Sequence, residues 1–427
     1  MHIKLTSLIF LFLFYSPIHV FGHGAVQRAS ELKDSEVRLF VADNMDGSVV
    51  VVDFPDGEIT HRVSTSPSIM ILASNKDNKY IYAMRGRDTD NDLTSILSTG
   101  FDMKEQQFRK PHVIRTIKTD TPGGPRDSKM ATVGGYDAIL TEGEAEVVVI
   151  MSDDIDGYSE LKTKRYKIAE PDHYHYLEGE TYLYIGHLFN GFVQVLDRST
   201  GEEVKRINGC PMLHGMTEDE ESGRLIFSCA RDVIVVGTLG EEKAKLIARI
   251  PYPENTGRGC AAFLKGEGRV QWCYTEGIIP RLYRVDFAQE PYQFTTLSVE
   301  SSIQQNSSDD GKYLMVLSKQ GVLYLYHGRD GNLIKTIQVS EPFLGDWFED
   351  VGKAILPDIE SHNGIAYISL THEGRIAEID LEQGKIKRYI DIGGFPTRIV
   401  LLAKETLVDA TNSVSYTHLT LPTIYSV

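Results

Sequence analysis

A strand–turn–strand unit that recurs along the chain constrains the fold more than any other feature of the sequence. Each copy has an apolar strand, a tight turn, a second strand of alternating polarity and a closing turn that contains glycine. The alternation has the period of two expected for strands, and the DG, NG, QG and EG turns supply the positive φ that tight hairpins require. Clear copies stand at 38–58, 182–202, 313–332 and 365–385, and weaker ones begin near Lys79, Glu146, Arg224 and Arg269.

The spacing of these copies predicts an all-β fold, a single β-propeller. Copies start about 36 to 66 residues apart, mostly in the low forties, which is the period of propeller blades. Eight copies predict eight blades, although the close spacing of the copies at 146 and 182 leaves seven open. The first copy has no inner strand before it, and a strand at 396–405 follows the last one. We therefore expect the C-terminal strand to join the first blade and close the ring, which protects the sheet edges.

The two ends of the chain depart from the repeat. Residues 1–22 carry a lysine, an apolar stretch and a small residue at a plausible cleavage site, which is typical of a signal peptide. Residues 23–36 form a lead-in to the propeller at 37–412, and residues 413–427 resemble translated sequencing adapter, an artefactual tail. The protein is therefore expected outside the cytoplasm, periplasmic or secreted, with no membrane span once the signal peptide is removed.

Charge and cysteine content narrow the classes of function. The 44 basic and 60 acidic residues give a formal net charge of −16, and no basic cluster is present. Phosphate binding needs a basic face, so nucleic acid is excluded as a partner. The four cysteines suit an exported chain with two disulfides. We expect a monomer.

The four cysteines fit the hairpins of neighbouring blades. Cys210 is expected to start an inner strand and Cys229 to end the next strand, and Cys260 and Cys273 flank the LKGEG turn in the same roles. Residues equidistant from an antiparallel turn face each other with Cβ atoms about 4.5–5.5 Å apart, near disulfide reach. The predicted pairs are Cys210–Cys229 and Cys260–Cys273. A metal site made by Cys210 and His214 is the alternative, which an oxidising compartment disfavours.

Histidines gather at the predicted starts of inner strands, in the segments PDHYHY (171–176), PMLHGM (211–216) and PDIESHNG (357–364). Strand alternation sends the two histidines of the first segment to the same side. Two or three imidazoles with a carboxylate make a good zinc site, although imidazole also suits copper and nickel. Channel histidines bonded to backbone and water are the alternative. The predicted metal ligands are His173, His175, His214, His362 and Asp172, with Glu360 as an alternative acid.

A family resemblance rests on four segments. They are RLFVADNMDGSVVVVDFPDGE, GCPMLHG, LIFSCARDVIVV and AYISLTHEGRIAEIDLEQGKI, and together they resemble the AztD-type periplasmic zinc metallochaperones. The resemblance extends over about residues 37–401. It implies an exported propeller that hands zinc to the solute-binding protein of a zinc ABC importer, with His214 as a ligand. The sequence departs from the family in having no evident His-rich N-terminal loop and no histidine on the third inner strand.

The sequence therefore favours an exported zinc-binding propeller that delivers or buffers zinc for a transport system, rather than an enzyme. It contains no G-x-S-x-G elbow, H-E-x-x-H helix or Gly-rich phosphate loop. A propeller hydrolase or lyase with a channel metal or a histidine base is the first alternative. A non-catalytic interaction propeller is the second.

Overall fold

The computed structural model describes residues 37–407 with short gaps. The gaps are 66–68, 76, 86–92, 103, 119–127, 134, 152–154, 156–160, 220, 254–258, 276–280, 300–301 and 344–355. The predicted signal peptide (1–22), lead-in (23–36) and artefactual tail (413–427) lie outside the described residues.

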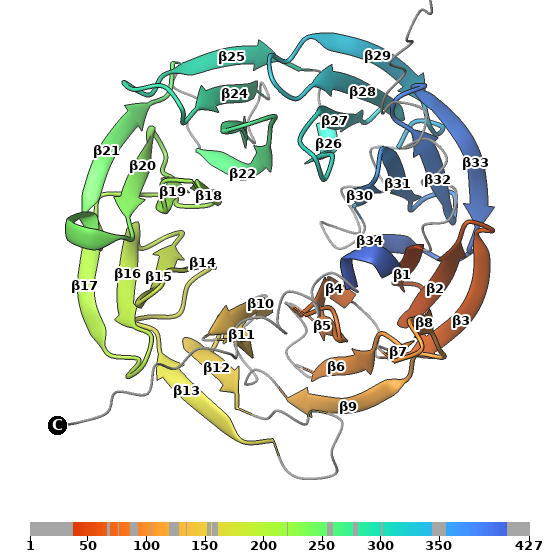
Figure 1. Cartoon of the computed structure of the whole chain (residues 1–427), viewed down its shortest axis with the longest axis horizontal. Coiled ribbons are helices and arrows are strands. Elements are labelled where there is room, and N and C mark those ends of the chain that lie inside the picture. Colours follow the sequence, from red (N-terminus) through yellow and green to blue (C-terminus); the bar gives the residue numbers. More distant parts are fainter. Residues whose placement is uncertain are drawn as a thin grey trace, which may run out of the picture. The chain divides into compact units, whose positions relative to one another are not determined.

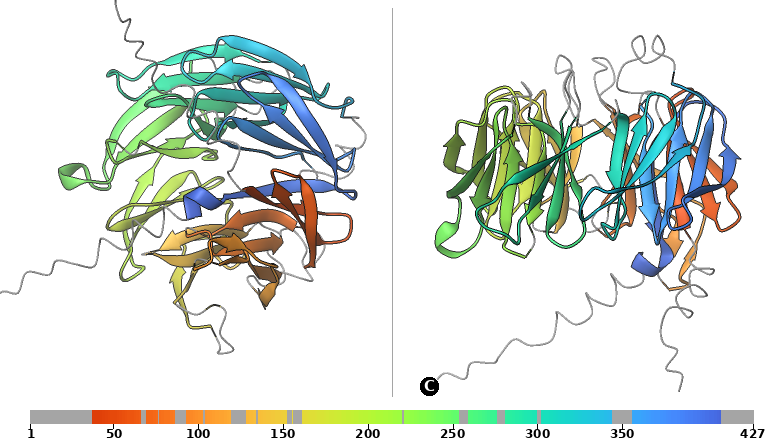
Figure 2. Two further views of the ribbon diagram at one scale, coloured as in Figure 1. Left: turned by 45° about the vertical axis from the view of Figure 1, so that its right-hand side comes forward. Right: turned by 90° about the horizontal axis from the view of Figure 1, so that it is seen from above.

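The described residues form eight four-stranded antiparallel sheets arranged as the blades of a propeller (Figure 1). The right-hand view of Figure 2 shows the ring from the side, with the blades edge-on. Blade 1 consists of β34 (Pro396–Ala403), β1 (Val37–Asp43), β2 (Ser48–Phe54) and β3 (Glu58–Ser64). Blade 2 consists of β4 (Ile69–Ser74), β5 (Tyr80–Arg85), β6 (Leu93–Ser98) and β9 (Val113–Lys118). Blade 3 consists of β10 (Ser128–Val133), β11 (Tyr136–Thr141), β12 (Glu146–Ile150) and β13 (Thr163–Lys167). Blade 4 consists of β14 (Tyr174–Glu178), β15 (Tyr182–His187), β16 (Phe192–Asp197) and β17 (Glu203–Asn208).

The second half of the ring repeats this plan. Blade 5 consists of β18 (Met216–Asp219), β19 (Arg224–Ser228), β20 (Asp232–Gly237) and β21 (Leu246–Pro251). Blade 6 consists of β22 (Cys260–Lys265), β23 (Val270–Thr275), β24 (Arg281–Asp286) and β25 (Phe294–Ser298). Blade 7 consists of β26 (Ser302–Ser307), β27 (Tyr313–Ser318), β28 (Val322–His327) and β29 (Leu333–Gln338). Blade 8 consists of β30 (Ile359–His362), β31 (Ile365–Leu370), β32 (Arg375–Asp380) and β33 (Lys385–Asp391). A hairpin of β7 (Phe101–Asp102) and β8 (Gln107–Phe108) precedes β9, and η1 (Gly240–Glu242) is a short 3₁₀ helix.

The predicted ring closure is confirmed. The C-terminal strand β34 is the inner strand of blade 1 and pairs antiparallel with β1, so that Val37 lies opposite Ala403 and Val41 opposite Ile399. The blade number is eight, not seven. The predicted start of the copy near Glu146 is wrong by one strand. Glu146 begins β12, the third strand of blade 3, whereas the other copies begin with the second strand of a blade, which here is β11. The two closely spaced copies therefore belong to separate blades.

A substitution in one turn explains this error. In the turns between the second and third strands of blades 1, 4, 7 and 8, a glycine takes the positive φ, as at Gly47 and Gly191. In blade 3 the same position is Ala145, with φ of 56°. The repeat is conserved in backbone conformation there, although the glycine that marks it in the sequence is missing.

The core lies between the blades. The middle strands are buried on both faces, as in β2, where Val49, Val50, Val51 and Val52 are all inaccessible to solvent. The outer strand β3 is mostly exposed by contrast. Each hydrophobic cluster joins side chains of two neighbouring blades, and the ring is thus one continuous packed wall. None of the helices in the described part of the chain is long and apolar enough to cross a membrane.

Both predicted disulfides are present. Cys210 is bonded to Cys229 with Cα atoms 4.7 Å apart, and Cys260 to Cys273 with Cα atoms 5.5 Å apart. The predicted strand positions need correction, because Cys210 lies in the connection before β18 and not at the start of that strand. Cys260 lies opposite Thr275 rather than Cys273, next to an irregularity in the register.

Peptide mapping of the oxidised protein without reductant should recover these two pairs. The expected result is one cross-linked peptide pair per disulfide and no free thiol, since all four cysteines are paired in the structure. Crossed pairs such as Cys229–Cys260 would contradict the strand arrangement of blades 5 and 6.

The inner strands β26 and β30 run in the same direction along the channel, and β18 and β22 begin on one side of it, where the Gly215 N–H donates to Cys260 O at 2.8 Å. Between β26 and β30, Gln304 contacts Asp358 near the strand starts, and Asp309 accepts a hydrogen bond from the Asn363 backbone past the strand ends. We call the side of the ring where inner strands begin the start end, and the opposite side the far end. A site residue is placed by which of these two ends it occupies.

Candidate metal site

Three of the predicted histidines converge at the start end. One ligand nitrogen from each of His173, His175 and His214 lies within 4.8 Å of the other two. The ring centroids are 5.2 Å apart for His173 and His175, 5.5 Å for His173 and His214, and 5.1 Å for His175 and His214. These residues are referred to below as the three-histidine cluster. All three side chains are only partly exposed.

Strand alternation places the two histidines of blade 4. His173 immediately precedes β14 and His175 is its second residue, while Tyr174 between them is fully buried in the core. Because successive side chains of a strand point to opposite faces, both histidines face the same way. The sequence therefore determines this half of the cluster locally.

The third histidine is held by blade 5 through a disulfide-anchored segment. His214 lies between Cys210 and β18, and the Cys210–Cys229 bond ties that segment to the residue directly after β19. The His214 backbone N–H donates to Ser228 O at 3.3 Å. The next residue, Gly215, approaches blade 6 so closely that a Cβ would lie 2.8 Å from the Cys260 carbonyl oxygen. Glycine is thus required beside this histidine.

A carboxylate that the sequence analysis missed contacts the cluster. Glu142 follows β11 of blade 3, is 1% exposed, and its Oε1 lies 2.9 Å from His173 Nδ1. The same oxygen accepts the Tyr174 backbone N–H at 3.2 Å. Glu142 would have been found if the second strand of blade 3 had been placed at 136–141, because it then falls at the start end beside blade 4.

Asp172, the predicted acid of the site, lies beside the cluster but is not one of its converging ligand residues. Its buried carboxylate accepts the backbone N–H groups of His173 at 2.7 Å, Phe189 at 3.1 Å and Asn190 at 3.0 Å. It also accepts Asn190 Nδ2 at 2.8 Å. These bonds fasten the β15–β16 turn to the start of β14. The structure thus places the predicted ligand Asp172 next to His173 but outside the three-histidine cluster, with its carboxylate directed to backbone and Asn190 donors.

His362 and Glu360 lie on blade 8 and are not part of the cluster. His362 is the last residue of β30 and therefore lies at the far end, not at the start end as predicted. Its Nε2 contacts Glu405 Oε1 at 2.7 Å and its Nδ1 lies 3.4 Å from Asp309 Oδ2. Each of the two imidazole nitrogens of His362 thus contacts one carboxylate, Asp309 of blade 7 or Glu405 of the segment after β34. His362 therefore links blades 7 and 8 to that segment. Burial and the nearby Asp358 raise the pKa of Glu360.

This link predicts a pH dependence of stability. Burial alone would lower the pKa of His362, but the hydrogen bonds and charges of Asp309 and Glu405 outweigh it and raise the pKa. A raised folded-state pKa adds stability below the unfolded value of about 6.5, and the gain disappears as pH rises through the folded value. Urea denaturation should show that His362→Gln lowers the free energy of unfolding more at pH 5.5 than at pH 8.5. An equal cost at both pH values would contradict this role.

The donor set of the three-histidine cluster fits zinc. Zn–N bonds of about 2.0–2.1 Å put tetrahedral ligand nitrogens about 3.3 Å apart. With separations of up to 4.8 Å, the ligand nitrogens would have to approach one another by up to about 1.5 Å around an ion. Three imidazoles leave the fourth coordination position of a tetrahedral zinc ion open for water or for a ligand from a partner protein.

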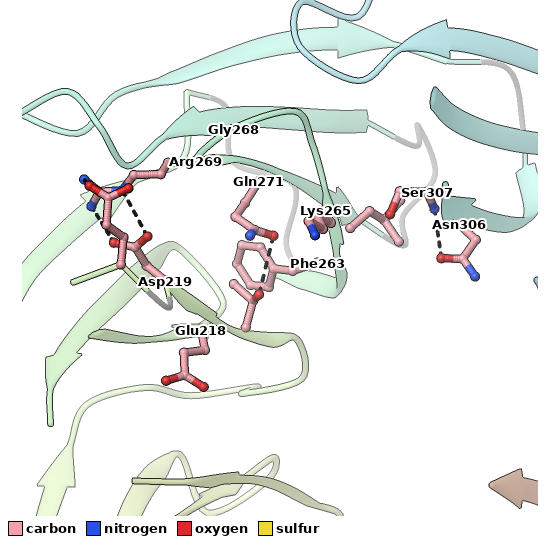
Figure 3. A pocket seen from close by; sticks show the side chains of 12 residues that line it. Glu218, Asp219, Phe263, Lys265, Gly268, Arg269, Gln271, Asn306 and Ser307 are labelled. Carbon is pink, nitrogen blue, oxygen red and sulfur yellow. Dashed lines mark hydrogen bonds and ion pairs between the residues drawn. The ribbon is translucent and has the colours of Figure 1, made fainter. Parts of the chain in front are cut away.

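A separate cavity of about 680 Å³ lies toward the far end (Figure 3). It is lined by the last residues of three inner strands, Asp219 of β18, Lys265 of β22 and Ser307 of β26. Asp219 and Arg269 on its wall form an ion pair, with Nε and Oδ1 3.1 Å apart. None of the three histidines lines this cavity, so it is distinct from the cluster.

Comparison with known proteins places the fold. No family profile and no curated protein sequence matches the chain. Two solved structures of AztD from Citrobacter koseri, one of them the apo form, superpose with TM-scores of 0.68 and 0.69 at 18% and 17% identity. Each match covers 86% of this chain and 98% of AztD. Dihydro-heme d1 dehydrogenase NirN matches with a TM-score of 0.57 and 12% identity, over 85% of this chain and 74% of NirN. The resemblance to AztD inferred from the sequence is confirmed at the level of the fold, an eight-bladed propeller.

Proposed function

We propose that this protein is an extracytoplasmic zinc-binding propeller that buffers zinc or delivers it to a transport system. The observation that carries the proposal is the three-histidine cluster, in which ligand atoms from two adjacent blades lie within 4.8 Å of one another. Neutral imidazole is the most common metal ligand in proteins, and three of them with an open position are typical of zinc.

The surroundings of the cluster support reversible binding. The histidines are partly exposed at the start end of the channel, so an ion can reach them from solvent or from a docked protein. They come from a strand start and a short connection, both held by hydrogen bonds and one disulfide. A site fixed in this way loses little entropy on binding.

Delivery to a solute-binding protein of a zinc importer is the finer part of the proposal. It rests on the sequence resemblance to AztD-type metallochaperones and on the shared fold. Two disulfides and the predicted signal peptide at 1–22 support a location outside the cytoplasm.

Equilibrium dialysis with metal analysis tests the proposal. The expected result is one zinc ion per chain, bound more tightly than about 10 μM, with binding weakening below about pH 6 because protons compete with metal for imidazole. Weak binding of Ca²⁺ or Mg²⁺ instead would favour a propeller hydrolase or lyase. Absence of metal binding would favour a non-catalytic interaction propeller and would refute the zinc proposal.

A further inference from the structure

The strongest unused feature of the site is the buried carboxylate of Glu142. It comes from blade 3, whereas the three-histidine cluster is built by blades 4 and 5. Its oxygen is 2.9 Å from His173 Nδ1, and it is not one of the residues whose ligand atoms gather within 4.8 Å. Glu142 thus contacts the cluster at His173 and lies outside the set of three converging ligand atoms.

This contact determines which nitrogen of His173 faces a metal ion. A carboxylate oxygen only accepts hydrogen bonds, so the ring nitrogen next to it must carry the proton. In a neutral imidazole, a proton on Nδ1 leaves Nε2 as the lone-pair donor. Carboxylate partners of metal-binding histidines fix the tautomer and the ring orientation in this way.

The backbone around His173 is held as well. Oε1 of Glu142 also accepts the Tyr174 N–H, and Asp172 accepts the His173 N–H. The carbonyl of His173 accepts the Leu188 N–H at 3.1 Å. With main chain and ring both fixed, a water-accessible ligand keeps one geometry before any ion arrives.

We propose that Glu142 is the positioning residue of the zinc site: it holds His173 as the Nδ1–H tautomer and thereby presents Nε2 to the ion. This inference rests on the proposed zinc function for its effect on affinity. The His173 tautomer is a property of the metal-free protein and does not depend on whether zinc binds.

The test compares wild type with Glu142→Ala, Glu142→Gln and the control Glu144→Gln. Glu144 lies in the same turn and pairs with Arg165 at 3.3 Å, so its change removes the same charge without touching His173. Competition with a chelator should show a zinc affinity about 10–100-fold lower for Glu142→Ala. Glu142→Gln keeps an acceptor oxygen, so its zinc affinity should lie between those of wild type and Glu142→Ala. The zinc affinity of Glu144→Gln should equal that of wild type.

Long-range ¹H–¹⁵N NMR of the histidine rings in metal-free protein provides the second readout, with His173 assigned from His173→Ala. The expected result is a proton on Nδ1 in wild type and a mixture of tautomers in Glu142→Ala. If Glu142→Ala does not fold, Glu142→Gln carries both measurements. A proton on Nε2 in wild type, or unchanged affinity in both Glu142 variants, would overturn the inference. Wild type that binds no zinc refutes the proposed function, while the ring protonation still decides the role of Glu142.

Discussion

His214→Ala should reduce zinc affinity more than 100-fold, because losing a ligand costs more than the roughly 10–100-fold typical of residues behind the ligands. His214 is the sole contribution of blade 5 to the three-histidine cluster, so its removal leaves only the two ligands of blade 4. Titration with a competing chelator measures the change. The double variant His173→Ala/His175→Ala should lose at least as much.

His327→Ala is the matched control. His327 is the last residue of β28 on blade 7 and is exposed, and it is not part of the three-histidine cluster. Its zinc affinity should equal that of wild type. If His214→Ala binds zinc as tightly as wild type, the site has been assigned to the wrong residues and the zinc proposal fails with it.

Asp172→Ala should lower the free energy of unfolding by about 3 kcal/mol, since a buried donor left without its partner costs about 1–3 kcal/mol. The carboxylate accepts three backbone N–H groups and one side-chain amide in the β15–β16 turn and at the start of β14. Urea denaturation followed by circular dichroism gives the difference.

Asp172→Asn separates this structural role from that of a ligand. The amide retains one acceptor oxygen, so the variant should be less destabilised than Asp172→Ala. Its zinc affinity in the folded state should fall far less than that of His214→Ala, because the carboxylate is directed to the turn. A loss of affinity equal to that of His214→Ala would restore Asp172 as a ligand.

The architecture could be predicted because short-range sequence patterns mark each blade of the propeller. Alternating strands and turn glycines recur once per blade, and the unmatched strand at 396–405 indicated how the ring closes. Blade 3 was misplaced because Ala145 adopts the positive φ that glycine takes elsewhere. A backbone conformation can thus be kept where its sequence marker is lost.

The site was predicted in part for a related reason. His173, His175 and His214 follow from alternation and from where two inner strands begin. His362 was misplaced because β30 is only four residues long and His362 is its last residue, whereas His175 is the second residue of β14. The place of Glu142 in the site comes from its contact with His173 of the neighbouring blade. A sequence pattern within one blade cannot predict such a contact.

The pairing of β1 with β34 has a consequence for how the chain folds. Val37 meets Ala403, so the first blade is completed only by nearly the last described residues. Contacts between such distant segments raise the contact order, and loop closure must precede their stabilisation, which slows folding. Until β34 pairs with it, β1 is bonded only to β2 and exposes one unpaired, largely apolar strand edge, the kind of intermediate from which aggregation begins. Blades 2 to 8 are each built from consecutive segments and can form early, so assembly of the ring should be limited by this single late step.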